Sequence, residues 1–104
     1  MSIPAKPANE AIRLAALHQC KILDTAPEET FDEITRLAAN GCQIPIAFVS
    51  FIDADRQWFK SSIGLEAAEI PRNLSFCAHA ILQSEILVLP DTLADERFAD
   101  HPLV

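Results

Sequence analysis

The sequence predicts an α+β domain, a mixed α/β fold in which helices flank a central antiparallel sheet. Two observations lead to this class. Apolar residues recur at helical spacing through most of the first 40 residues, and a run of β-branched and aromatic residues follows over residues 44–52. Turn residues then separate this run from a second extended stretch, as in a hairpin. The predicted order is helix, helix, strand, strand, helix, strand and short helix.

The first helix is predicted to follow a disordered lead-in over residues 1–8, which contains two prolines. Asn9 can cap this helix, which runs to about Cys20. Its apolar stripe consists of Ile12, Ala15, Ala16 and Leu17. Because the stripe precedes any element of the core, we expect this helix to mediate self-association.

A second helix is predicted to begin after the sequence Thr25-Ala26-Pro27-Glu28, which matches a capping box. In such a box the Thr hydroxyl and the Glu carboxylate accept hydrogen bonds from amides of the first turn. Gly41 is the predicted stop of the helix. The apolar positions at helical spacing are Phe31, Ile34, Leu37 and Ala38.

Residues 44–52 form the predicted central strand, because both of its alternating side-chain sets are mostly apolar. Residues 53–56 have turn chemistry, and residues 57–63 resume an extended pattern as a strand nearer the edge. A strand that is apolar on both faces needs neighbours on both sides. We therefore expect sheet partners that this chain does not supply.

The second half of the chain is predicted to open with a polar loop over residues 65–73. Ser75 is a suitable N-cap for a helix that reaches Leu82. A short apolar strand over residues 86–89 and a brief helix over residues 93–99 complete the prediction.

Composition narrows the range of partners. The 104 residues carry a net charge of −7, which repels phosphate backbones and anionic membrane surfaces, so we expect no nucleic acid and no membrane partner. The N-terminus lacks the apolar segment of a signal peptide, which favours a cytoplasmic location. The three cysteines are widely spaced, so neither a disulfide framework nor a metal site is indicated.

Four stretches together resemble the first two thirds of a bacterial GAF sensory domain. They are NEAIRLAALHQCKILDTAPEETFDEITRLAA, IPIAFVSFIDADRQWFKSSIGL, IPRNLSFCAHAI and LVLPDTLADERFADHPLV. The resemblance implies a GAF-like, PAS-related fold with a six-stranded antiparallel sheet. In that family, helices on one face form dimers, and loops and short helices on the other face enclose a small-molecule pocket. We expect residues 9–104 to be a partial GAF domain, incomplete at its C-terminus.

The resemblance also implies which residues bind the ligand. Cys77 stands near the start of the third helix, where the helix dipole could lower its pKa and make it reactive. Ala78 separates it from the histidine, unlike the adjacent Cys-His pair of bilin-binding members, so no covalent pigment or other cofactor is expected. The predicted ligand-binding residues are Phe48, Ser50, Phe76, Cys77, His79, Asp91, Arg97 and Phe98.

The predicted function is that of a non-catalytic sensory domain with no enzymatic activity. It would bind an unidentified small molecule, form a homodimer through its N-terminal helix, and signal to a C-terminal output domain such as a histidine kinase or a diguanylate cyclase. One alternative is a pure dimerisation module with a filled core instead of a pocket. Another is a GAF-fold thiol enzyme that reduces free methionine sulfoxide, which would need a second thiol near Cys77.

Overall fold

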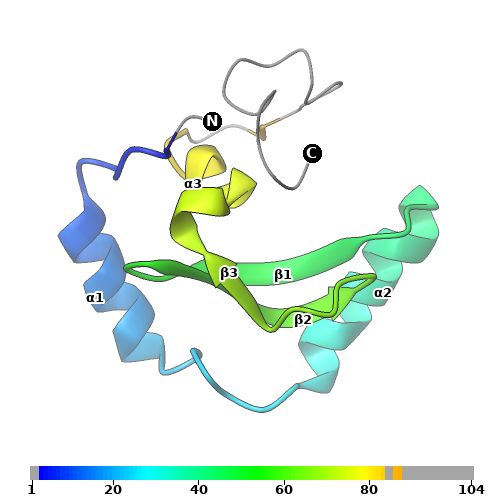
Figure 1. Ribbon diagram of the computed structural model, residues 1–104. Coiled ribbons are helices and arrows are strands. Elements are labelled where there is room, and N and C mark those ends of the chain that lie inside the picture. Colours follow the sequence, from blue (N-terminus) through cyan, green and yellow to red (C-terminus); the bar gives the residue numbers. More distant parts are fainter. Residues whose placement is uncertain (1–2, 84–85, 88–104) are drawn as a thin grey trace.

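The computed structural model describes residues 3–83 and 86–87. Its three strands form one antiparallel sheet in the order β1-β2-β3, so the predicted α+β class is confirmed (Figure 1). The predicted strand over 86–89 lies partly, and the brief helix over 93–99 wholly, outside the described residues. The elements are α1 (Glu10–Cys20), α2 (Glu29–Cys42), β1 (Ala47–Ile52), β2 (Arg56–Ile63), β3 (Glu69–Pro71), the 3₁₀ helix η1 (Arg72–Leu74) and α3 (Phe76–Ala80).

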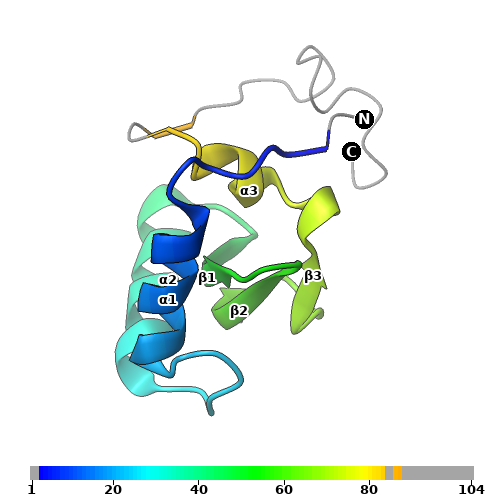
Figure 2. The same cartoon turned by 90° about the vertical axis from the view of Figure 1, so that its left-hand side faces the viewer.

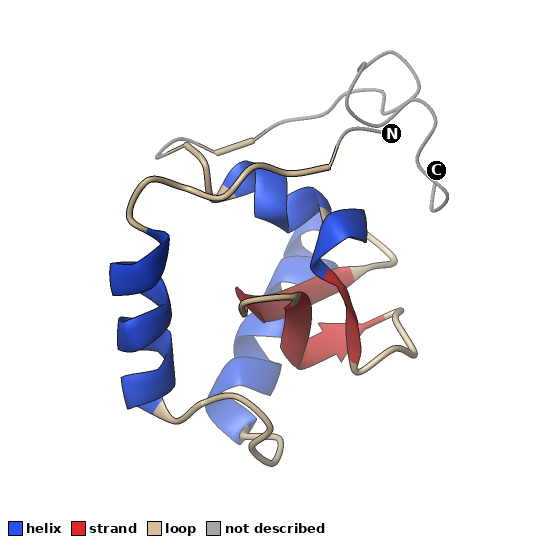
Figure 3. Ribbon diagram, turned by 60° about the vertical axis from the view of Figure 1, so that its left-hand side comes forward, coloured by secondary structure: helices blue, strands red, loops and turns tan. Residues whose placement is uncertain are grey.

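The helices take different positions around the sheet. α2 packs against β1 and β2, whereas α1 lies beside the turn that joins these two strands (Figure 1). Both long helices lie on the same side of the strands in Figure 2, with β3 farthest from them. α3 lies above the strands (Figure 3).

The sheet differs from the prediction in two respects. Among the described strands, β2 is central and β1 lies at the edge, the reverse of the predicted arrangement. The predicted polar loop over residues 65–73 contains β3, which pairs with β2 through Gln57 and Ile70. Three residues ending at a proline are too short to show a period-2 pattern, so sequence alone could not reveal this strand.

A β-bulge in β2 explains how the sheet contacts α2. Ser50 lies opposite Phe59 and Val49 lies opposite Ser61, which leaves Lys60 as the extra residue. A bulge turns the side chains that follow it relative to the regular alternation. Accordingly Ser61 donates a hydrogen bond to Asp32 of α2, at 2.7 Å.

Lys60 is buried and replaces the predicted capping box. Its ammonium donates hydrogen bonds to the Thr25 hydroxyl (2.6 Å) and to the Ala26 carbonyl (2.5 Å), and it forms an ion pair with Glu28 (2.6 Å). The prediction of a capping box is therefore wrong: α2 begins at Glu29 without a side-chain cap. The two predicted capping side chains satisfy a buried cation instead.

Two other helix ends also differ from prediction. Gly41 lies within α2, which continues to Cys42 and ends at Gln43 in the left-handed conformation, with φ of 53°. Asn9 occupies the N-cap position of α1, but its side chain makes no capping hydrogen bond. Ser75 does cap α3, as predicted, by accepting a hydrogen bond from the Ala78 amide at 3.0 Å.

α1 is held by polar contacts, because none of its residues is buried. Arg13 donates a hydrogen bond to the Ile52 carbonyl at 2.5 Å, and His18 lies 2.9 Å from Asp53. Ile12, in the predicted stripe, is 75% exposed. The apolar stripe of α1 therefore does not contribute to the core of the described chain.

Candidate functional site

A pocket of about 600 Å³ lies between the sheet and α3. No residue of α2 lines it, since α2 contacts β1 and β2 elsewhere. Phe48 and Phe59 meet edge to face in its wall, with ring centroids 5.1 Å apart. The lining residues are Ile46, Phe48, Gln57, Phe59, Gly64, Leu65, Glu66, Ala67, Ile70, Phe76 and Cys77.

Gly64 shapes the loop that forms one side of the pocket. Its φ is +80°, and an added Cβ would collide with the Pro45 carbonyl oxygen. Only glycine combines this backbone conformation with so close an approach. The loop that follows β2 and lines the pocket therefore depends on Gly64.

A hydrogen-bonded polar chain links the strands to α3 at the pocket. The Gln57 amide nitrogen donates to the Ser50 hydroxyl at 2.8 Å, and the Ser75 hydroxyl donates to the Gln57 carbonyl oxygen at 2.5 Å. Gln57 and Ser75 are each 1% exposed. Buried polar groups are stable only when they are paired in this way. The hydrogen bonds among Ser50, Gln57 and Ser75 therefore fix α3 relative to the sheet.

Cys77 lines the pocket as a protonated thiol. Burial raises its pKa, although hydrogen bonds with Gln57 and Ser50 act in the opposite direction. The expectation that the helix start lowers this pKa is wrong, because α3 has only five residues and the removal of water dominates. The thiol is therefore less reactive than a free cysteine at neutral pH.

The predicted ligand-binding residues divide into three groups. Phe48, Phe76 and Cys77 line the pocket. Ser50 is bonded to Gln57, which lines it, and His79 is buried in α3 but is not a lining residue. The remaining three, Asp91, Arg97 and Phe98, lie outside the described residues.

The predicted residues include none from the β2 and β3 side of the pocket. Gln57 and Phe59 are two residues apart, so they lie on the same face of β2. That alternation was visible in the sequence and could have identified both residues. Ile70 could not be found, because it belongs to the unpredicted strand β3.

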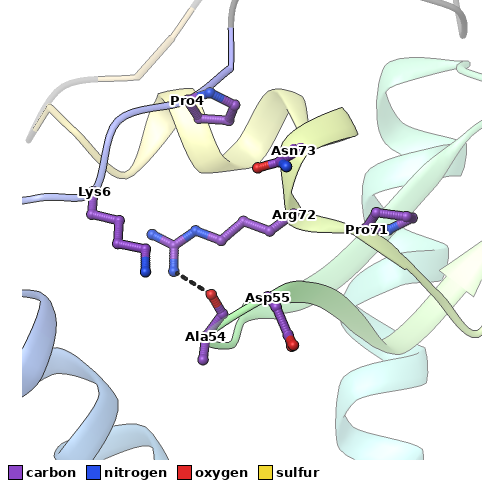
Figure 4. A pocket seen from close by; sticks show the side chains of 7 residues that line it. All are labelled: Pro4, Lys6, Ala54, Asp55, Pro71, Arg72 and Asn73. Carbon is purple, nitrogen blue, oxygen red and sulfur yellow. Dashed lines mark hydrogen bonds between the residues drawn. The ribbon is translucent and has the colours of Figure 1, made fainter.

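A smaller polar hollow of about 240 Å³ lies at the start of η1 (Figure 4). Lys6 and Arg72 extend into it from opposite sides. Arg72 is 4% exposed and donates hydrogen bonds to both carboxylate oxygens of Glu10, at 2.7 and 3.0 Å, and to the Asp53 carbonyl at 2.9 Å. The hydrogen bonds from Arg72 lower the pKa of Glu10 to about 2. This contact joins the first turn of α1 to the segment that leads into α3.

Residues 3–83 and 86–87 contain no group of three or more His, Cys, Asp or Glu side chains placed to hold a metal ion. Within the same ranges, no helix has both the length and the apolar character needed to cross a bilayer.

Comparison with known proteins gives two findings. The family model described as the GAF domain matches residues 26–104. A protein of Pseudomonas aeruginosa named as a cyclic di-GMP phosphodiesterase is 41% identical over 104 residues, which cover all of this chain and 18% of that protein. The chain thus spans less than a fifth of the length of this relative. The relative is named as an enzyme, and this overturns our expectation of a protein without enzymatic activity.

Proposed function

Because the chain belongs to the GAF domain family, we propose that it is the sensory domain of a signalling protein that acts on cyclic di-GMP. In this proposal a small molecule binds in the pocket between the sheet and α3, and the bound state changes the rate of cyclic di-GMP hydrolysis elsewhere in the protein. The relative supports a cyclic di-GMP output over a histidine kinase. The free cysteines of the described residues favour a cytoplasmic location.

The pocket is the observation that carries the proposal. A volume of about 600 Å³ falls within the range of small-molecule sites, and its walls combine aromatic side chains with a few fixed polar groups. A dimerisation module without a ligand would have a filled core at this position. The thiol-enzyme alternative receives no support, since Cys20 and Cys42 end two other helices, and burial raises the pKa of Cys77.

The signal would leave the pocket through the Arg72–Glu10 pair. Arg72 precedes the N-cap of α3 by three residues, and Glu10 lies in the first turn of α1. A ligand that moves α3 would therefore shift the start of α1. The exposed face of α1 is where we propose that two copies associate, so the shift would reach the dimer interface.

The test fills the pocket in the full-length natural protein. Cys77→Phe fills it from α3 and Ile70→Phe fills it from β3, whereas Leu82→Phe adds the same ring at an exposed position that does not line it. We expect the two filled variants to change cyclic di-GMP hydrolysis at least threefold in the same direction, with Leu82→Phe at the wild-type rate. Folded, filled variants that hydrolyse cyclic di-GMP at the wild-type rate would refute the sensory role.

A further inference from the structure

The charge of the pocket wall restricts what it can bind. Among the described lining residues, Glu66 is the single charged side chain, and it is exposed at the rim. The lining residues described include no lysine, arginine or histidine. Against the described part of the wall, an anion would lose its hydration without gaining a counter-charge, and this loss is severe for phosphate and carboxylate groups.

The polar groups at the pocket are already paired with one another. Gln57 uses its amide nitrogen on Ser50 and its carbonyl oxygen on Ser75, and Ser75 also accepts from the Ala78 amide. A strongly polar ligand, such as a sugar or a nucleotide, would have to compete with these bonds for the Gln57 and Ser75 side chains. An apolar ligand would leave the hydrogen bonds of Gln57 intact, so this part of the pocket wall would keep its structure when the ligand binds.

The rest of the wall suits aromatic rings. Phe48, Phe59 and Phe76 contribute rings from β1, β2 and α3, and the edge-to-face pair of Phe48 and Phe59 shows the geometry that aromatic groups prefer. Phe48 is 38% exposed in the structure. A flat ring placed against it would bury this surface.

We infer that the ligand is an uncharged, ring-containing and largely apolar molecule, and that the pocket does not bind cyclic di-GMP or another phosphate-bearing compound. This inference rests on the proposed function and names the chemistry that the sensory site recognises. On this inference, the molecule that the domain senses is chemically unrelated to cyclic di-GMP, the proposed substrate of the full-length protein.

Three indoles that share one ring and differ in charge test the inference in the full-length protein. The probes are 3-methylindole, which is neutral, tryptamine, a cation, and indole-3-acetate, an anion. Isothermal titration should show 3-methylindole binding at least tenfold more tightly than indole-3-acetate, with tryptamine between them because Glu66 lies at the rim. Cys77→Phe should abolish the 3-methylindole signal, whereas Leu82→Phe should preserve it.

The possible outcomes separate the ligand class from the sensory role. If indole-3-acetate or cyclic di-GMP binds more tightly than 3-methylindole, and Cys77→Phe blocks that binding, the inference is overturned while the sensory role stands. Failure of all three indoles to bind at millimolar concentration also overturns it. Ile70→Phe repeats the test from the opposite wall, so a folding defect of Cys77→Phe cannot decide the result. The sensory role is judged separately, by the hydrolysis rates of the filled variants.

Discussion

Glu10 carries much of the contact between α1 and the rest of the domain. Its carboxylate receives both hydrogen bonds from Arg72 and one from Arg13, and the side chain of Arg72 is only 5% exposed. Loss of the carboxylate charge would leave a buried guanidinium without its counter-ion. We expect Glu10→Gln to destabilise the domain by about 2 kcal/mol and to speed amide exchange in α1 more than in α2. Hydrogen exchange followed by mass spectrometry measures both helices in one sample.

The matched control for Glu10→Gln is Glu29→Gln. Glu29 forms an ion pair of similar length, 3.0 Å, with Arg36, but both side chains are more than half exposed. Such a pair is worth little, so this control should change stability by less than about 0.5 kcal/mol. Equal exchange in α1 for the wild type and for Glu10→Gln would show that α1 is held by other contacts.

The Glu10–Arg72 pair also predicts a pH dependence. The pKa of Glu10 is lowered from 4.5 to about 2, so the unfolded chain takes up the proton first as the pH falls. The stabilisation from this group is therefore fully present above about pH 4.5 and is lost as the pH approaches 2. Urea unfolding of the full-length protein at pH 6 and at pH 3 should show that the difference in stability between the wild type and Glu10→Gln shrinks at the lower pH. A difference that stays constant or grows would contradict the assignment.

The Cys77 thiol is expected to react more slowly than the other two cysteines. Because burial raises its pKa, the thiolate is scarce at neutral pH, whereas Cys20 and Cys42 are exposed. Iodoacetamide at pH 7.5 should alkylate Cys77 at least tenfold more slowly than the other two, as followed by peptide mass spectrometry. Cys77→Ser should preserve the fold, with a stability change within about 1 kcal/mol. Faster alkylation of Cys77 would indicate a stabilised thiolate and would reopen a chemical role for this residue.

Among the secondary-structure elements, the two glycines are expected to respond in opposite ways to replacement by alanine: one variant should be less stable and the other more stable. Gly64 has φ of +80° and lies against the Pro45 carbonyl, so Gly64→Ala should destabilise the domain by about 2 kcal/mol or more. Gly41 lies within α2 with open space around its Cα, so Gly41→Ala should stabilise it by about 0.5 to 1 kcal/mol. Chemical denaturation of both variants measures the pair. If Gly41→Ala were instead destabilising, Gly41 would be needed as a helix stop, as the sequence had suggested.

The exposed face of α1 predicts self-association. Ile12 is 75% exposed and no residue of α1 is buried, so Ile12→Glu removes no packing within the chain. In the full-length protein we expect it to weaken a dimer at least tenfold by sedimentation, because a carboxylate would be desolvated at the interface. Ala11→Glu adds the same charge at an exposed position about 100° around the helix from Ile12 and should leave the dimer unchanged. If neither variant alters the sedimentation coefficient, α1 does not form the interface.

For the molecule as a whole, sequence patterns located the long elements and missed the local exceptions. The apolar periodicity of α2 and the β-branched run of β1 were predictable because each extends over several residues. The bulge at Lys60, the strand β3 and the use of Thr25 and Glu28 by a buried lysine depend on contacts between distant segments, and no local pattern encodes them. The predicted site residues therefore include lining residues of β1 and α3 but none of β2 or β3.

By itself, the 104-residue chain has little buried apolar surface among its described residues. Of the described residues, five apolar ones form the buried core, and three of these are alanines: the five are Ala39, Ala47, Ile52, Trp58 and Ala78. Large apolar side chains such as Ile44, Ile46 and Phe48 are 38–47% exposed. Burial of apolar surface supplies most of the free energy of folding, so the core that the described residues form leaves them little margin over the loss of conformational entropy.

We therefore expect the 104-residue chain to behave as a loosely packed or self-associating species. It should bind the dye ANS, and its thermal transition should be broad, because specific packing is limited while the secondary structure persists. β1 lies at the edge of the sheet that the described residues form, and an apolar edge strand favours pairing with strands of other chains, which adds a further route to association. Calorimetry and sedimentation of the same sample provide the measurement. A sharp cooperative transition from a monodisperse species of 11.4 kDa would show that the packing of the described residues understates the stability of the domain.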